Sequence, residues 1–391
     1  MTSGWSIENP DGKEWNNLYL ACQNILTKNF LRKILLASYS GVYVDEYQDC
    51  SKPQHALICN LAEVLPCRIL GDPLQAIFDF ADELVDWESD IYPHFESLGT
   101  LDTPWRWKQH GCGELGEWLK EVRAQLSAGK CVDLSGAIPR TVSALPVDLD
   151  NFKDQKRLNV FYSFLKDDDT VIAMHGGAPE LKNKTHKLAQ SLSGKFSSIE
   201  EIEGRDLISF LKKLETTPNS SERFLLVIEF AKKCFTGLSA ALPESIKRGE
   251  PAKLTSRTKN LLLTTIANEC IADTSSALLR DFFLELKRCT GIEVYRRDLL
   301  NRFINVLKVH IAGRAPTLLE AAYLYQCEFR HSGRPVRHSK LIGTTLLVKG
   351  LEFDHAVILD AASLSAKELY VAMTRGSKSL TILTQKLQLP P

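Results

Sequence analysis

The segment Val42-Tyr43-Val44-Asp45-Glu46-Tyr47-Gln48-Asp49 decides how the rest of the chain is interpreted. Its two valines flank a tyrosine, which indicates a short buried strand, and two adjacent acids follow where that strand ends. Ligands of α/β proteins bind at the carboxyl ends of parallel strands. Adjacent acids there suit nucleotide hydrolysis, because one carboxylate can bind Mg²⁺ while its neighbour activates water. An acidic turn without a catalytic role explains this segment alone equally well.

The residues around this segment predict alternating helices and strands. Apolar residues at steps of three and four predict a helix from 13 to about 38. Ser51-Lys52-Pro53 predicts the start of another helix, with serine as the cap and proline in the first turn. A short strand is expected at Arg68-Ile69-Leu70, immediately before Gly71-Asp72-Pro73. This alternation is typical of a parallel sheet.

The remainder of the chain predicts a second α/β region with a helical insertion. A linker is expected over about 132–155 because proline and aspartate are frequent there. Leucine-rich periodicity between about 199 and 325 predicts helices almost throughout. The strands of this second region are expected near 170–174, 341–347, 356–359 and 380–383, with helices at 179–192 and near 367–375. The predicted fold class is therefore α/β with an all-α insertion.

Composition limits the classes of protein that need considering. The chain has 391 residues, 44% of them hydrophobic and 25% charged, which suits a soluble protein of two or three domains. Lys+Arg and Asp+Glu both number 48, so any nucleic-acid site would be a local basic surface. The ten cysteines include no Cys-x-x-Cys pair, which argues against zinc and against a disulfide framework. With no leader or membrane-length apolar run, we expect a cytoplasmic protein without a membrane partner.

Five segments together resemble the UvrD/Rep/PcrA group of superfamily 1 DNA helicases. Asp45-Glu46-Tyr47-Gln48-Asp49 is similar to motif II of that family, and Gly71-Asp72-Pro73-Leu74-Gln75-Ala76-Ile77-Phe78 is similar to motif III. The segments 101–106, 348–354 and 369–375 resemble motifs IV, V and VI. All five occur in the order that the family shows, which makes chance an unsatisfactory explanation.

The resemblance implies an ATP site with Mg²⁺. Asp45 would bind Mg²⁺, and Glu46 would contact the ion through water and activate the hydrolytic water. Gln75 would sense the γ-phosphate, since an amide can bond both phosphate oxygen and water. Arg106 and Arg375 would neutralise charge on the γ-phosphate in the transition state. Motif V adds two further residues expected beside the nucleotide, Gly350 and Glu352.

The resemblance also implies single-stranded DNA as a partner. The aromatic candidates for stacking with bases are Phe78, Phe80 and Trp105. The basic candidates for contact with the DNA are Lys349, Arg334 and Arg337. The alternative explanation for each aromatic residue is core packing. The alternative for the basic run before motif V is a solvated loop.

The same resemblance implies RecA-like motor domains, the first of them incomplete. Residues 1–130 would form the remainder of domain 1A and carry motifs II to IV. Residues 131–198 would begin domain 2A, and 340–391 would complete it with motifs V and VI. Residues 199–339 would form a reduced, all-α insertion like domain 2B.

The sequence departs from the family in one large respect, because no Gly-x-x-x-x-Gly-Lys-Ser/Thr segment occurs in it. We therefore expect little ATP turnover by this chain alone. One interpretation is a C-terminal portion of an ATP-dependent 3′–5′ DNA helicase. For activity it would need a phosphate-loop segment that is either on a separate polypeptide or missing. A catalytically silent subunit that binds DNA or a protein such as a nuclease subunit is the alternative, and a truncated, non-functional fragment is a third. Asp79-Phe80-Ala81 and Leu346 also differ from motifs III and V.

Overall fold

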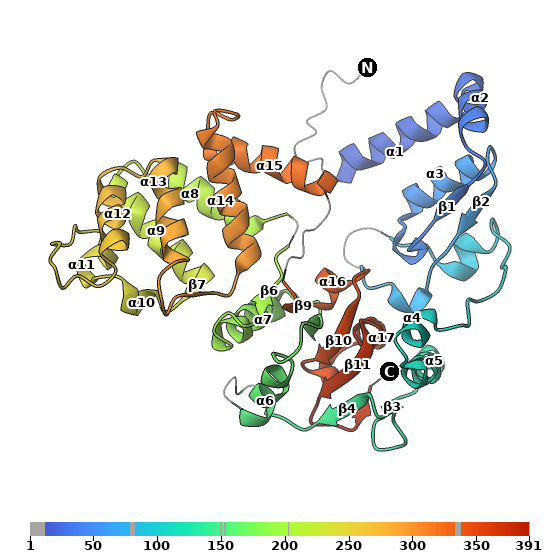
Figure 1. Ribbon diagram of the computed structural model, residues 1–391. Helices are drawn as coiled ribbons and strands as arrows, with labels where there is room; N and C mark the ends of the chain where they lie inside the picture. Colours follow the sequence, from blue (N-terminus) through green and yellow to red (C-terminus); the bar gives the residue numbers. More distant parts are fainter. Residues whose placement is uncertain are drawn as a thin grey trace. The chain divides into compact units, whose positions relative to one another are not determined.

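The computed structural model describes residues 12–78, 83–148, 151, 154–201, 203–332 and 338–390. The chain divides into two units. Figure 1 labels the helices and strands. Unit 1 comprises Met1–Val132, Leu364–Val371 and Pro390–Pro391, and unit 2 comprises Asp133–Ser363 and Ala372–Leu389. Each unit has its own hydrophobic core.

Unit 1 is built around two parallel strands. β1 (Val42–Val44) pairs with β2 (Cys67–Ile69), and α3 (Lys52–Ala62) connects them. This confirms the alternation predicted from the sequence. The expected burial of the first strand is wrong, because the side chain of Tyr43 is exposed. Only two strands form this sheet in the described part of unit 1.

The helices of unit 1 follow local sequence signals with one correction. Ser51 and Gln54 form a reciprocal capping box at the start of α3, as its sequence predicts. The single helix expected over 13–38 is instead two helices, α1 (Gly12–Leu26) and α2 (Asn29–Ser38). They separate because Lys28 has an extended backbone and the Thr27 hydroxyl hydrogen-bonds the Asn24 carbonyl.

The rest of unit 1 consists of short helices around a small core. The elements are the 3₁₀ helices η1 (Tyr47–Asp49) and η2 (Pro73–Gln75), the π-helix η3 (Trp87–Ile91), α4 (Trp105–Gln109) and α5 (Gly113–Ser127). Tyr47, Val85 and Ile91 are buried at the centre of this core. Tyr47 directly follows the two acids at the end of β1, so core packing fixes the backbone beside them.

Unit 2 contains a parallel sheet of six strands. Their order is β4-β11-β10-β5-β9-β6. The strands are β4 (Val142–Leu145), β5 (Val171–His175), β6 (Ser197–Ser198), β9 (Lys340–Thr344), β10 (Phe353–Ile358) and β11 (Gly376–Leu383). This sheet and its helices confirm an α/β fold. β5, β9, β10 and β11 were expected from the sequence, whereas the edge strand β4 lies inside the expected linker.

Four helices lie between strands of this sheet along the chain. They are α6 (Gln155–Ser163), α7 (Pro179–Ser191), α16 (Thr345–Val348) and α17 (Ala366–Met373). The predicted strand over 341–347 ends at Thr344, where α16 begins. Two further short strands are β3 (Val132–Asp133) and β12 (Gln388–Leu389), and η4 (Ala361–Ser363) is a 3₁₀ helix.

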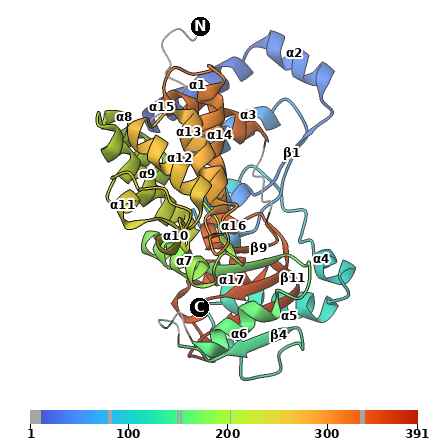
Figure 2. The ribbon, with the colours of Figure 1, turned by 60° about the vertical axis from the view of Figure 1, so that its left-hand side comes forward.

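The helices expected between 199 and 325 are present and gather into one bundle within unit 2 (Figure 2). They are α8 (Arg205–Thr216), α9 (Ser220–Cys234), α10 (Leu238–Ala241), α11 (Glu244–Lys247), α12 (Leu261–Ala272), α13 (Ser276–Leu286), α14 (Arg297–Ile311) and α15 (Leu318–Ser332). The strands β7 (Phe235–Thr236) and β8 (Glu293–Val294) pair within this region. Phe210, Phe230 and Phe303 pack in its core, with ring centroids 4.2 to 5.3 Å apart.

A buried ion pair joins the bundle to the sheet of unit 2. Arg296, which precedes α14, donates two hydrogen bonds of 2.7 and 2.6 Å to the carboxylate of Glu200. A third bond of 2.6 Å reaches Asp206 at the start of α8. These bonds neutralise a buried arginine and fix the segment that leaves β6 against the start of α14.

Asp354 joins three strands at the beginning of β10. The backbone N–H and the hydroxyl of Thr170, next to β5, each donate a 2.8 Å hydrogen bond to its Oδ2. Lys378 of β11 lies 2.9 Å from its Oδ1. Burial alone would raise the pKa of Asp354, but the bonds from Thr170 and Lys378 outweigh burial and lower this pKa to about 2.

We expect Asp354→Asn to lower the free energy of unfolding of unit 2 by about 1 kcal/mol at pH 7, allowing for solvent screening. A lowered carboxyl pKa contributes stability above the unfolded-state value of 3.8, and this contribution is lost as the pH falls toward about 2. Urea unfolding of both proteins from pH 7 to pH 2 should therefore show a difference that shrinks below about pH 4 and disappears near pH 2. A difference that stays constant with pH would contradict this role of Asp354.

Candidate functional site

The two acids singled out in the sequence lie at the carboxyl end of β1. Asp45 and Glu46 are both exposed there. The next strand, β2, leads into the loop that begins at Gly71, and backbone hydrogen bonds join the two strand ends. Leu70 N–H donates to the Val44 carbonyl at 2.8 Å, and Tyr47 N–H donates to the Leu70 carbonyl at 2.9 Å. The loops after β1 and β2 therefore lie side by side.

Glu46 has an unusual backbone for a residue other than glycine. Its φ is 55° and its ψ is 38°, in the left-handed region. The Asp45 carboxylate accepts a 2.8 Å hydrogen bond from the Glu46 N–H, which supports this conformation. Left-handed non-glycine residues cost of order 1 kcal/mol and gather at functional sites. The turn thus directs two successive carboxylates away from the core.

Gln48 connects the two loops through its side chain. Only 2% of this residue is exposed. Its amide nitrogen donates to Glu46 Oε2 at 2.5 Å, and its amide oxygen accepts from the Asp72 N–H at 2.9 Å. The glycine at 71 makes this approach possible, because a Cβ there would lie 2.8 Å from Gln48 Oε1 and 3.0 Å from Trp87 Cζ2.

Asp72 extends this set of contacts to the expected phosphate-sensing glutamine. Its Oδ2 accepts a 3.0 Å hydrogen bond from the Gln75 amide, and its Oδ1 accepts a 2.7 Å bond from Arg123 of α5. Burial would lower the pKa of Arg123, but its bond to Asp72, with a smaller contribution from Tyr370, raises it. Glu46, Gln48, Asp72 and Gln75 thus form one connected network, which we call the acidic-loop network.

The remaining candidates of unit 1 lie on α4 and after η2. Arg106 is half-buried, and its guanidinium lies 5.5 Å from the ring centroid of Trp107. Trp105 is 66% exposed, so core packing does not explain this aromatic residue. Phe78 is half-buried. Phe80 lies outside the described residues, as do Arg334 and Arg337.

In unit 2 the structure brings Arg375, the last residue of the segment similar to motif VI, to the segment similar to motif V. Arg375 is 3% exposed and donates a 3.1 Å hydrogen bond to the carbonyl of Leu351. Leu351 lies between Gly350, whose φ of 76° makes a turn that favours glycine, and the exposed Glu352. Lys349 is half-buried in the same loop. Arg375, Gly350 and Glu352 therefore belong to one local site within unit 2.

Comparison with known proteins supports part of the resemblance. Residues 8–85 match the family model of the UvrD/REP helicase N-terminal domain. This UvrD-like segment contains both loops of the acidic-loop network. No curated protein matches the chain. The similarity of the later segments to motifs IV, V and VI stays a prediction from the sequence.

Two residues in or beside the acidic-loop network were missed by sequence reasoning. Gln48 lies within the segment similar to motif II, and its position two residues after Glu46 in the sequence was the available signal. Arg123 gave no signal, because it lies 51 positions from Asp72 along the chain. Its contact depends on how α5 packs against the loop after β2.

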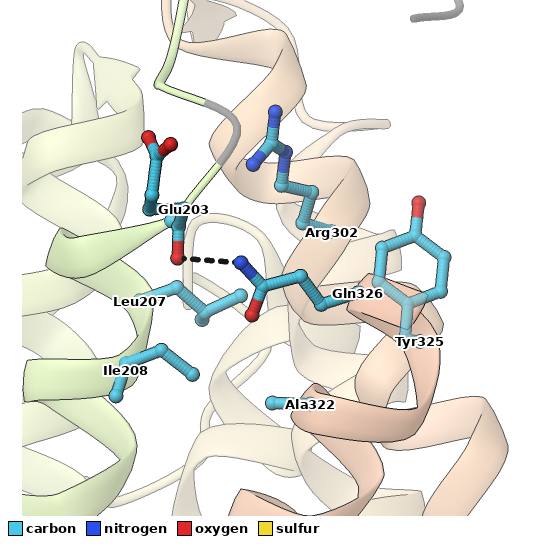
Figure 3. A pocket seen from close by; sticks show the side chains of 8 residues that line it. Glu203, Leu207, Ile208, Arg302, Ala322, Tyr325 and Gln326 are labelled. Carbon is cyan, nitrogen blue, oxygen red and sulfur yellow. Dashed lines mark hydrogen bonds between the residues drawn. The ribbon is translucent and has the colours of Figure 1, made fainter. Parts of the chain in front are cut away.

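A hollow in the helical bundle is a poor alternative site (Figure 3). It holds about 20 Å³, room for about one water molecule, so a nucleotide does not fit. Gln326 closes it by donating a 3.1 Å hydrogen bond to the carbonyl of Glu203, and Arg302 beside it is paired with Asp298. In the part of the chain that the structure describes, no helix is long and apolar enough to cross a membrane.

The close approach at Gly71 leads to a stability prediction. Gly71→Ala should lower the free energy of unfolding of unit 1 by about 1–3 kcal/mol, because its methyl group would overlap Gln48 and Trp87. Gly113→Ala, at the start of α5, is the matched control, since the nearest heavy atom to its Cβ would be 3.8 Å away. Urea unfolding followed by tryptophan fluorescence measures both. Equal stabilities for the two variants would contradict the close packing of Gly71 against Gln48 and Trp87.

Proposed function

We propose that this chain supplies the Mg²⁺-binding and water-activating side of an ATP site in a UvrD/REP-like DNA helicase that moves 3′ to 5′ along single-stranded DNA. The observation that carries this proposal is the acidic-loop network within the segment that matches the helicase family. The two units would then be RecA-like motor domains, with the helical bundle inserted in the second.

The residues at the end of β1 suit a hard divalent cation. Asp45 and Glu46 present carboxylate oxygens in an exposed turn, and oxygen is the ligand atom that Mg²⁺ prefers. When bound, Mg²⁺ would neutralise charge on the nucleotide phosphates. Asp45 would hold the ion, and Glu46 would accept a proton from the attacking water as general base.

The network positions these groups before a substrate binds. Gln48 holds the Glu46 carboxylate, so little side-chain freedom is lost when Glu46 contacts water. Asp72 holds Gln75 by its amide nitrogen at 3.0 Å. Because the amide nitrogen is held by Asp72, the amide oxygen of Gln75 would accept a hydrogen bond from the attacking water. Arg106 would contribute positive charge at the γ-phosphate.

Unit 2 would contribute the second arginine and the motif V loop. The Leu351 carbonyl and the Thr374 hydroxyl fix the Arg375 guanidinium in the loop that carries Gly350 and Glu352. We propose that the γ-phosphate competes for this guanidinium, which would couple nucleotide binding to the conformation of the loop. Lys349 in the same loop, with Phe78 and Trp105 of unit 1, would contact single-stranded DNA.

We further propose that a phosphate loop outside these 391 residues completes the site. Several apolar side chains of unit 1 support this, because they are exposed in the described structure. They are Phe30, Ile34 and Leu36 of α2, and Tyr43 of β1. Phe30 and Ile34 are one helical turn apart and share a face of α2, as exposed apolar side chains do where another segment covers a surface. A polypeptide that carries the phosphate loop and extends the two-stranded sheet would cover them.

DNA-stimulated phosphate release tests the proposal. The chain mixed with the product of the neighbouring reading frame should hydrolyse ATP, and Glu46→Gln should reduce the rate by about 10²- to 10⁴-fold because the general base is lost. Glu96→Gln, which removes an exposed acid of the same unit, is the matched control and should leave the rate unchanged. A rate unaffected by Glu46→Gln would overturn the proposal.

A catalytically silent subunit that binds DNA or a protein such as a nuclease subunit is the second candidate. The absence of a phosphate-loop sequence from the 391 residues favours it. It requires binding that persists in Glu46→Gln and Arg375→Ala and does not respond to ATP. Measuring single-stranded DNA affinity by fluorescence anisotropy in the same mixtures distinguishes the two candidates.

A further inference from the structure

A second cluster of chemically active side chains lies in unit 1, among η3, α3 and the core. His55 and Cys59 are one helical turn apart on α3, and His94 follows η3. One possible ligand atom from each lies within 4.8 Å of the other two. The rings of His55 and His94 have centroids 5.5 Å apart. Two imidazoles and a thiol thus converge from segments about 40 residues apart in sequence.

The distances within this cluster suit a tetrahedral transition-metal site. Cys59 Sγ lies 3.5 Å from His55 Nε2 and 3.9 Å from Nδ1. With a zinc–sulfur distance of about 2.3 Å and a zinc–nitrogen distance of about 2.0–2.1 Å, tetrahedral geometry separates sulfur and nitrogen by about 3.5 Å. His55 Nε2 is therefore the nitrogen placed to share an ion with Cys59.

Tyr47 orients the His55 ring from the opposite side. The Tyr47 hydroxyl is 2.7 Å from His55 Nδ1, and the tyrosine is fully buried. Histidines that bind metals through one nitrogen usually hydrogen-bond through the other, which fixes the ring. The His55 ring also bonds the backbone oxygen of Asp90, and a metal would have to compete with that bond.

Exposure and ligand type indicate what this cluster can bind. His55 is 8% exposed, Cys59 is half-buried and His94 is exposed, so an ion could enter from solvent on the His94 side. We propose that His55, Cys59 and His94 bind one zinc ion, with water as the fourth ligand. Two imidazoles and a thiolate favour zinc over Mg²⁺ or Ca²⁺, which prefer oxygen.

The other group of possible ligands among the described residues is His186, Glu200 and Asp206 in unit 2. Arg296 already pairs with both of its carboxylates at 2.6 Å. A buried guanidinium among the ligands repels a cation and occupies their lone pairs. This contrast restricts the proposal to the cluster of unit 1.

The sequence alone argued against zinc because no Cys-x-x-Cys pair occurs. The structure adds His94, which only the fold brings to the His55–Cys59 pair. Through Tyr47, the proposed site would tether η3 and α3 to the turn that follows Glu46. Zinc would therefore stabilise unit 1, because it binds the folded arrangement of these residues and not the unfolded chain.

Cobalt substitution tests the proposed site. The reduced, chelator-treated 391-residue chain should bind one equivalent of Co²⁺, with the intense visible bands of tetrahedral cobalt and a thiolate-to-cobalt charge-transfer band. Stoichiometric Zn²⁺ should abolish these bands. Cys59→Ser should lose the charge-transfer band. Loss of a residue that only hydrogen-bonds to a metal ligand typically weakens metal binding by about 10–100-fold. Because His94 is a proposed ligand, His94→Ala should weaken Co²⁺ binding by more than this.

Cys131→Ser is the matched control, because it removes an exposed cysteine outside the cluster and should leave the spectrum unchanged. His94→Ala alters an exposed side chain and should fold even if Cys59→Ser does not. Absence of the bands in the unaltered chain would overturn the proposal. Unchanged bands in both His94→Ala and a folded Cys59→Ser would also overturn it.

Discussion

The side chain of Gln48 makes the two hydrogen bonds on which the candidate nucleotide site depends. An amide carries both a donor and an acceptor. The buried Gln48 amide therefore donates a hydrogen bond to Glu46 and accepts one from the backbone N–H of Asp72. Loss of either bond would leave a buried polar group unsatisfied, at a cost of about 1–3 kcal/mol. Asp72 extends the constraint to Gln75 and Arg123. The loops after β1 and β2 are thus positioned as one set.

Tyr47 extends the same constraint in the opposite direction. Its backbone continues the left-handed turn at Glu46, its ring fills the core of unit 1, and its hydroxyl bonds His55. The acids at the strand end are therefore anchored to both β2 and α3. A zinc ion at the proposed site beside His55 would strengthen the second anchor without contacting the first.

Much of the fold could be predicted from the sequence because its signals are local. Val42-Tyr43-Val44 predicts β1, and Ser51 with Pro53 predicts the start of α3. The edge strand β4 could not be predicted, since four residues between loops become a strand only through pairing with β11, more than 230 positions away. The acids of the site were recognised because they form a local sequence segment. Arg123 became evident only from its tertiary contact with Asp72.

The central proposal is that Asp45 binds a divalent cation at the end of β1. Binding of Mn²⁺ in place of Mg²⁺ tests it most directly, measured by electron paramagnetic resonance with a non-hydrolysable ATP analogue and the polypeptide that supplies the phosphate loop. We predict that Asp45→Asn weakens Mn²⁺ binding by more than about tenfold, equivalent to about 1.4 kcal/mol, and that Glu96→Gln does not. Equal Mn²⁺ affinity in all three proteins would contradict it.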